Sequence, residues 1–166
     1  MKFYFEEKVY ISKKRGSCAF YIKTKNNVGI KVWFKSKAKN ESELKNSYAW
    51  KNAKKEFKLL SKIKNSGLTP IPFKLTFLKS PDNQYLYPAI LMENIVGKTL
   101  SDIFYRNPEK TFIFNEKKCN AHILSKELDS SLKVLGIAHN DIHFGNILIG
   151  KNSIKVIDLN LAQETK

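Results

Sequence analysis

The stretch His139-Asn140-Asp141-Ile142-His143-Phe144-Gly145-Asn146 carries more chemically active side chains than its neighbours in this 166-residue chain. It contains a carboxylate, two histidines and, at its end, an amide. Two short apolar runs follow, Ile147 to Ile149 and Ile154 to Ile157, and they predict a β-hairpin. Asp158 comes directly after the hairpin, so we expect the hairpin to bring Asn146 and Asp158 close together.

Asp141, Asn146 and Asp158 are the residue types that a magnesium-assisted phosphoryl transfer requires. A carboxylate must receive and orient the attacking hydroxyl, and hard oxygen ligands must bind Mg²⁺, because the charge of the transferring group has to be neutralised. Asp141 is the candidate for the first role, and Asn146 and Asp158 are the candidates for the second. The sequence therefore predicts a phosphotransfer site in this region.

The same stretch resembles the catalytic loop of the protein-kinase superfamily, H-x-D-x-x-x-x-N, which a strand and a metal-binding Asp follow. Val28-Gly29-Ile30-Lys31 resembles the V-A-I-K strand of that family. Glu56, before Leu59-Leu60, resembles the ion-pairing Glu of its αC helix. The segments Leu91 to Asn94 and Gly97 to Leu100 resemble the hinge and the start of the first C-lobe helix, so the resemblance covers nearly the whole chain.

The resemblance implies ATP and Mg²⁺ as cofactors and a role for each matching residue. Asp141 would act on the acceptor hydroxyl, while Asn146 and Asp158 would bind Mg²⁺. The residues expected to bind the nucleotide are Lys31 (α- and β-phosphates), Glu56 (holding Lys31), Gly16 (phosphate-covering loop), and Glu93 and Asn94 (backbone groups for adenine).

The expected fold is α+β and bilobal, with an N-lobe over residues 1–92, a hinge over 93–97 and a reduced, mainly helical C-lobe over 98–166. Alternating apolar runs and turn residues predict five antiparallel strands in the N-lobe, near residues 9–12, 19–23, 28–34, 73–78 and 86–92. Helical periodicity predicts an αC helix within 40–65, and further helices over 99–105 and 116–135.

Three features depart from the family pattern. The phosphate-covering loop around Gly16 has a single glycine, and Asp158-Leu159-Asn160 stands where the family has Asp-Phe-Gly. Eight residues follow Asp158, so the expected core lacks an activation segment and a peptide-binding platform. His143 replaces the Lys of Ser/Thr protein kinases, and the loop looks closer to aminoglycoside- and choline-type phosphotransferases, lipopolysaccharide-core kinases and RIO-type kinases.

Composition adds a prediction about partners and location. The chain has 30 basic and 15 acidic residues and a formal net charge of +15, which favours an acidic or phosphate-bearing partner, nucleic acid among them. A partner chain that completes the substrate site is a further expectation. Two distant cysteines, no signal-peptide pattern and no long apolar run predict a cytoplasmic protein without a transmembrane segment.

Three functions fit these observations. The first is an ATP- and Mg²⁺-dependent kinase that transfers the γ-phosphate to a Ser/Thr hydroxyl of a protein, itself included, as a reduced RIO-like layout implies. The second is a small-molecule or carbohydrate kinase, which His143 favours and the lack of a large helical insert disfavours. The third is a pseudokinase or nucleotide-binding interaction module, suggested by the glycine-poor loop and disfavoured by the intact Lys31, Asp141, Asn146 and Asp158.

Overall fold

The structure, a computed structural model, describes residues 19–24, 28–80, 82–104 and 109–165 and has a mixed α+β fold with several antiparallel sheets. The chain divides into two compact units. One unit comprises residues 1–58 and 71–94, and the other comprises residues 59–70 and 95–166. Each unit is described separately below.

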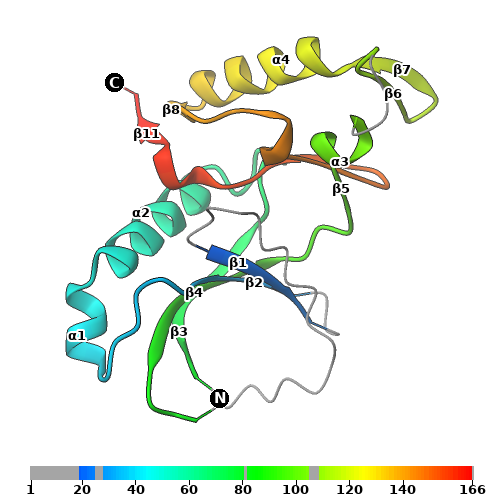
Figure 1. The fold of residues 1–166 in the computed structure, drawn as a ribbon. Helices are drawn as coiled ribbons and strands as arrows, with labels where there is room; N and C mark the ends of the chain where they lie inside the picture. Colours follow the sequence, from blue (N-terminus) through cyan, green and yellow to red (C-terminus); the bar gives the residue numbers. More distant parts are fainter. Residues whose placement is uncertain (1–18, 25–27, 81, 105–108, 166) are drawn as a thin grey trace. The chain divides into compact units, whose positions relative to one another are not determined.

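A four-stranded antiparallel sheet forms the centre of the first unit (Figure 1). Its strands lie in the order β1-β2-β4-β3 and are β1 (Ala19–Lys23), β2 (Val28–Trp33), β4 (Leu86–Glu93) and β3 (Pro72–Lys79). These strands lie where the apolar runs predicted them. The fifth expected strand, at residues 9–12, falls outside the described residues.

Strand β2 alternates between two environments, as the two-residue period of a strand requires. Ile30 and Val32 are buried in an apolar cluster with residues of β1 and β4. Lys31 and Trp33 point to the opposite face, where Lys31 meets helix α2. A cationic side chain in the second strand of the sheet is thereby held on the face that the helix covers.

Two helices, α1 (Glu41–Asn46) and α2 (Tyr48–Lys62), follow β2 in the described part of the chain (Figure 1). The boundary between the two units falls within α2, after residue 58. The prediction of a single helix within residues 40–65 is wrong, because the structure has two helices in this range. Ser47 between the two helices has an extended backbone, and its Oγ accepts a hydrogen bond from the Trp50 N–H at 3.1 Å. A serine that caps a new first turn offers the backbone an alternative to a continuous helix.

The second unit combines short strands with two α-helices. Its elements are β5 (Gly97–Thr99), α3 (Leu100–Phe104), β6 (Thr111–Phe114), β7 (Lys117–Asn120), α4 (Ala121–Val134), β8 (Ile137–Ala138), β9 (Ile147–Gly150), β10 (Ile154–Val156) and β11 (Gln163–Glu164). They form three sheets, β10-β9-β5, β11-β8 and β6-β7. Among the described residues this unit therefore contains more strand structure than the expected mainly helical lobe.

The helix expected over residues 116–135 begins later than predicted, at Ala121. The preceding residues form the β6-β7 hairpin, whose turn residues Asn115 and Glu116 both have positive φ. Asn120 then caps α4, since its side chain accepts the N–H groups of His122 and Ile123. The Glu and Lys residues at 116–118 favour helix intrinsically, but cross-strand pairing overrides that preference here.

In the part of the chain that the structure describes, no helix is long and apolar enough to span a membrane.

Candidate functional site

His139 fixes the start of the loop that carries Asp141. It directly follows β8, which pairs with β11, and its side chain is fully buried. The Nδ1 atom accepts the backbone N–H of Asp141 at 3.3 Å, and Nε2 lies 3.2 Å from the Ile157 carbonyl oxygen. This pattern requires a neutral ring with its proton on Nε2. Desolvation by burial lowers the pKa of His139 and so favours that neutral form.

Asn140 supplies a second connection between the loop and the segment after the hairpin. Its side-chain amide donates to the Leu161 carbonyl oxygen at 3.1 Å. Its backbone is left-handed, with φ of 62°, and that of Asp158 is left-handed as well, with φ of 66°. Asn and Asp are the non-glycine residues that adopt this conformation most readily. Asn140 and Asp158 thus both have a backbone conformation that most residue types disfavour.

Asn146 joins Asp141 to the hairpin. Its amide nitrogen donates to the Asp141 backbone oxygen at 3.0 Å and to the Asp141 carboxylate at 3.3 Å. The Asn146 backbone oxygen accepts the Ile157 N–H at 2.9 Å, which extends the β9-β10 ladder by one step. Because Asp158 follows Ile157, Asn146 and Asp158 stand at the same end of the hairpin. The structure therefore brings the two predicted metal ligands to one place.

His143 lies beside the predicted catalytic carboxylate. Its Nδ1 accepts the Gly145 N–H at 3.0 Å, and its Nε2 is 3.9 Å from Asp141 Oδ2. Both side chains are about half exposed. The Asp141 carboxylate and the His143 ring are therefore both accessible to solvent.

Asn146 and Asp158 carry oxygen atoms of the kind that Mg²⁺ prefers as ligands. Within the described ranges, no three His, Cys, Asp or Glu side chains converge as a metal centre. Mg²⁺ is commonly bound by one or two protein oxygen ligands together with phosphate oxygens and water. The amide nitrogen of Asn146 is turned toward Asp141, so its oxygen and the Asp158 carboxylate are the ligands that the chain would supply.

The other predicted residues belong to the first unit, and Lys31 and Glu56 form an ion pair there. Lys31 Nζ lies 2.9 and 2.8 Å from the two carboxylate oxygens of Glu56. The Glu56 side chain is 2% exposed and that of Lys31 is 11% exposed. Lys31 Nζ also lies 5.0 Å from the centre of the Trp33 ring. Lys31 and Glu56 are both largely buried, so each charge depends on the other for compensation and the ion pair restricts both side chains.

Both backbone groups of Glu93 have partners within the first unit. The Glu93 N–H donates to the Ile71 oxygen at 2.8 Å, and its carbonyl oxygen accepts the Tyr21 hydroxyl at 3.2 Å. Asn94 is buried. Gly16, the remaining predicted nucleotide-binding residue, lies outside the described residues.

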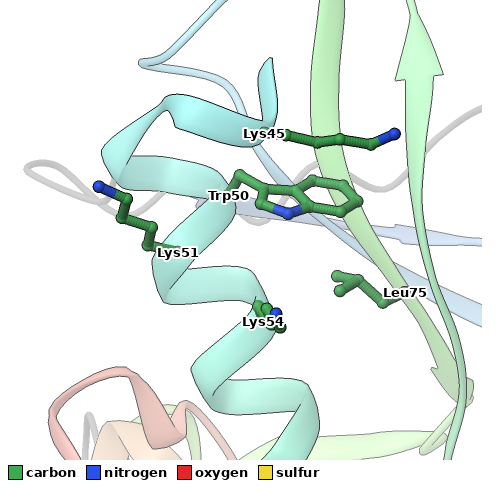
Figure 2. A pocket seen from close by; sticks show the side chains of 5 residues that line it. All are labelled: Lys45, Trp50, Lys51, Lys54 and Leu75. Atoms are coloured by element: carbon green, nitrogen blue, oxygen red, sulfur yellow. The ribbon is translucent and has the colours of Figure 1, made fainter. Parts of the chain in front are cut away.

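A basic groove, lined by Lys45, Trp50, Lys51, Lys54 and Leu75, is a separate feature of the first unit (Figure 2). It encloses about 500 Å³ and contains none of the predicted site residues. The groove lies between α1, α2 and β3, and the indole of Trp50 extends across it toward Leu75 (Figure 2). Lys45 is paired with Glu41 at 3.0 Å.

Sequence reasoning did not single out Tyr21, which bonds to Glu93, or Asn140, which connects the loop to Leu161. Asn140 stands next to Asp141, and an Asn at that point indicates a possible left-handed residue. The signal for Tyr21 is Gly29, because a glycine inside a strand marks a close approach of another group. An added Cβ on Gly29 would collide with the Tyr21 hydroxyl.

No protein-family model and no curated protein matches this chain.

Proposed function

We propose that the chain is an ATP- and Mg²⁺-dependent kinase of the bilobal protein-kinase-like class that transfers the γ-phosphate to a Ser/Thr hydroxyl of a protein, itself included. The observation that carries the proposal is the double hydrogen bond from Asn146 to Asp141, at the end of the hairpin that Asp158 follows. It gathers a carboxylate for the acceptor and two oxygen ligands for a cation. Phosphoryl transfer depends on this kind of positioning and charge neutralisation.

In this proposal Asp141 orients the acceptor hydroxyl and takes its proton. The hydrogen bond from Asn146 Nδ2 keeps the carboxylate in place, and the neutral His139 fixes the backbone that carries it. Asn146 and Asp158 would hold Mg²⁺, which would supply positive charge to neutralise the phosphates. Lys31, oriented by Glu56, is suited to bind the α- and β-phosphates, as in the family that the sequence resembles.

The test is incubation with ATP labelled in its γ-phosphate, with Mg²⁺, in the presence and absence of a cell extract. We expect label on protein, and we expect Asp141→Ala to abolish it while ATP binding persists, because the variant removes acceptor orientation. Asp158→Asn should weaken the binding of Mg²⁺-ATP. Asp129→Ala is the matched control, since Asp129 lies on α4 and pairs with Lys133. Full transfer by Asp141→Ala, or equal loss in the control, contradicts the proposal.

A small-molecule or carbohydrate acceptor is the second candidate, and the position of His143 favours it. The Nε2 of His143 lies near the Asp141 carboxylate in an exposed setting, where it can donate to a small hydroxylated acceptor. Label that appears in small molecules of the extract supports this candidate. Binding of ATP without transfer to any acceptor would instead support a nucleotide-binding interaction module.

We also propose that the basic groove binds an acidic segment of the protein acceptor. Lys51 and Lys54 are exposed, and they line the groove together with Trp50, which adds an apolar surface to it. Lys51→Gln with Lys54→Gln should weaken binding of a glutamate-rich peptide more than the equal charge change Lys117→Gln with Lys118→Gln. Equal weakening in both pairs would assign the effect to net charge alone.

A further inference from the structure

Tyr21 lies on the same face of the sheet as the predicted phosphate-binding lysine. The β1-β2 register pairs Tyr21 directly with Lys31. Directly opposed residues on antiparallel strands project to the same face. The face that carries the Lys31–Glu56 ion pair therefore carries the phenol ring of Tyr21 as well.

The Tyr21 hydroxyl uses the Glu93 backbone group that is best suited to bind a base. The N–H of Glu93 donates to the backbone oxygen of Ile71, which precedes β3. The Glu93 carbonyl oxygen is the group that can accept a hydrogen bond from an amino group. The Tyr21 hydroxyl donates to that oxygen at 3.2 Å. A purine amino group that approached the same oxygen would meet the Tyr21 phenol there.

Gly29 provides the room in which the Tyr21 ring lies. A Cβ at this position would collide with the hydroxyl oxygen and ring atoms of Tyr21. Glycine weakens a strand interior because it packs no side chain, so its presence in β2 indicates a close approach by another group. In the V-A-I-K strand that this segment resembles, the corresponding residue is Ala, which would not leave the same space.

We propose that Tyr21 is an autoinhibitory side chain that occupies the base-binding position of the nucleotide-free protein. This inference rests on the proposed nucleotide site. A nucleotide binds when the Tyr21 hydroxyl has left the Glu93 carbonyl oxygen. The apparent affinity is therefore the intrinsic affinity multiplied by the fraction of molecules in which the hydroxyl has left. Gly29 leaves space for the Tyr21 ring in this blocked state, and the hydrogen bond to the Glu93 carbonyl oxygen stabilises it.

The experiment measures the binding of a fluorescent ATP analogue, with association and dissociation rates followed separately by stopped flow. Tyr21→Phe removes the hydroxyl but keeps the ring, and Gly29→Ala displaces the ring without changing Tyr21. For Tyr21→Phe we expect about twofold to tenfold tighter binding, the range that the loss of one hydrogen bond implies. We expect Gly29→Ala to tighten binding as well. Tyr48→Phe is the control, because Tyr48 is 78% exposed on α2.

The gain should appear in the association rate, since the variants remove a blocked state of the free protein. The dissociation rate should stay unchanged. Unchanged or weaker binding by Tyr21→Phe, or a faster dissociation, overturns the inference and shows that Tyr21 is neutral or supports the base. If circular dichroism shows folded proteins and neither the wild type nor any variant binds the analogue, the proposed function fails and the autoinhibitory role fails with it.

Discussion

Removal of the Lys31 charge should destabilise the protein strongly, and removal of both charges should restore most of that loss. Glu56 is 2% exposed, and both of its oxygens lie within 2.9 Å of Lys31 Nζ. At this separation the attraction is about 6 kcal/mol for an effective dielectric constant of about 20, and desolvation of the two groups offsets most of it. Lys31→Met leaves a buried carboxylate without this cation.

The expected loss for Lys31→Met is roughly 3–5 kcal/mol in the free energy of unfolding, the range for one broken partner of a buried pair. In Lys31→Met with Glu56→Leu, the loss should fall to within about 1 kcal/mol of the wild type, because a neutral apolar pair fits the same space. Lys45→Met is the control. Lys45 and Glu41 are more than half exposed, so its cost should stay below about 1 kcal/mol.

Urea denaturation followed by far-UV circular dichroism measures these differences, and ATP binding measured in parallel separates structure from function. The double variant should be folded and stable but should bind ATP poorly, since it lacks the cation for the phosphates. The reasoning is refuted if the double variant loses as much stability as Lys31→Met and Glu56→Leu, each measured alone, lose in total. It is also refuted if Lys31→Met costs less than the exposed control.

Two further predictions concern the loop that carries Asp141. Burial lowers the pKa of His139 in the folded state relative to about 6.5 in the unfolded chain, so the unfolded state gains a proton first as pH falls. The free energy of unfolding should therefore decrease as pH drops below about 6.5, and urea titrations should show a weaker decrease for His139→Gln. Asn140→Gly loses the bond to Leu161, whereas Asn140→Ala should cost roughly 1–2 kcal/mol more by thermal unfolding, because alanine disfavours its left-handed backbone.

The strands of the first unit were predictable from sequence because each is a dense apolar run bounded by turn residues. The β6-β7 hairpin was not, since Glu116 to Lys118 favour a helix locally, whereas the structure pairs β6 with β7 across the turn. The break at Ser47 was missed for a related reason: helical periodicity continues through it, and its hydroxyl cap is the sole local sign.

In the candidate site, too, contacts between residues close in sequence were predictable, and contacts between residues far apart in sequence were not. The loop and the hairpin lie close together in sequence, so the approach of Asn146 to Asp158 followed from the spacing of the apolar runs. The partner of the Tyr21 hydroxyl lies 72 residues away, at Glu93. Pairing over that distance depends on how β1, β2 and β4 are ordered in the sheet, which a single sequence does not specify.

The pairing of β8 with β11 has a consequence for the order in which parts of the chain fold during synthesis. Strand β8 leads into His139, but its partner, Gln163–Glu164, lies further along the sequence. The contacts of His139 with Ile157 and of Asn140 with Leu161 also form only after those later residues have been synthesised. On the ribosome, where N-terminal segments fold first, the first unit can form while the loop that carries Asp141 is still without these partners. The loop that carries Asp141 would therefore acquire its geometry after the first unit has formed.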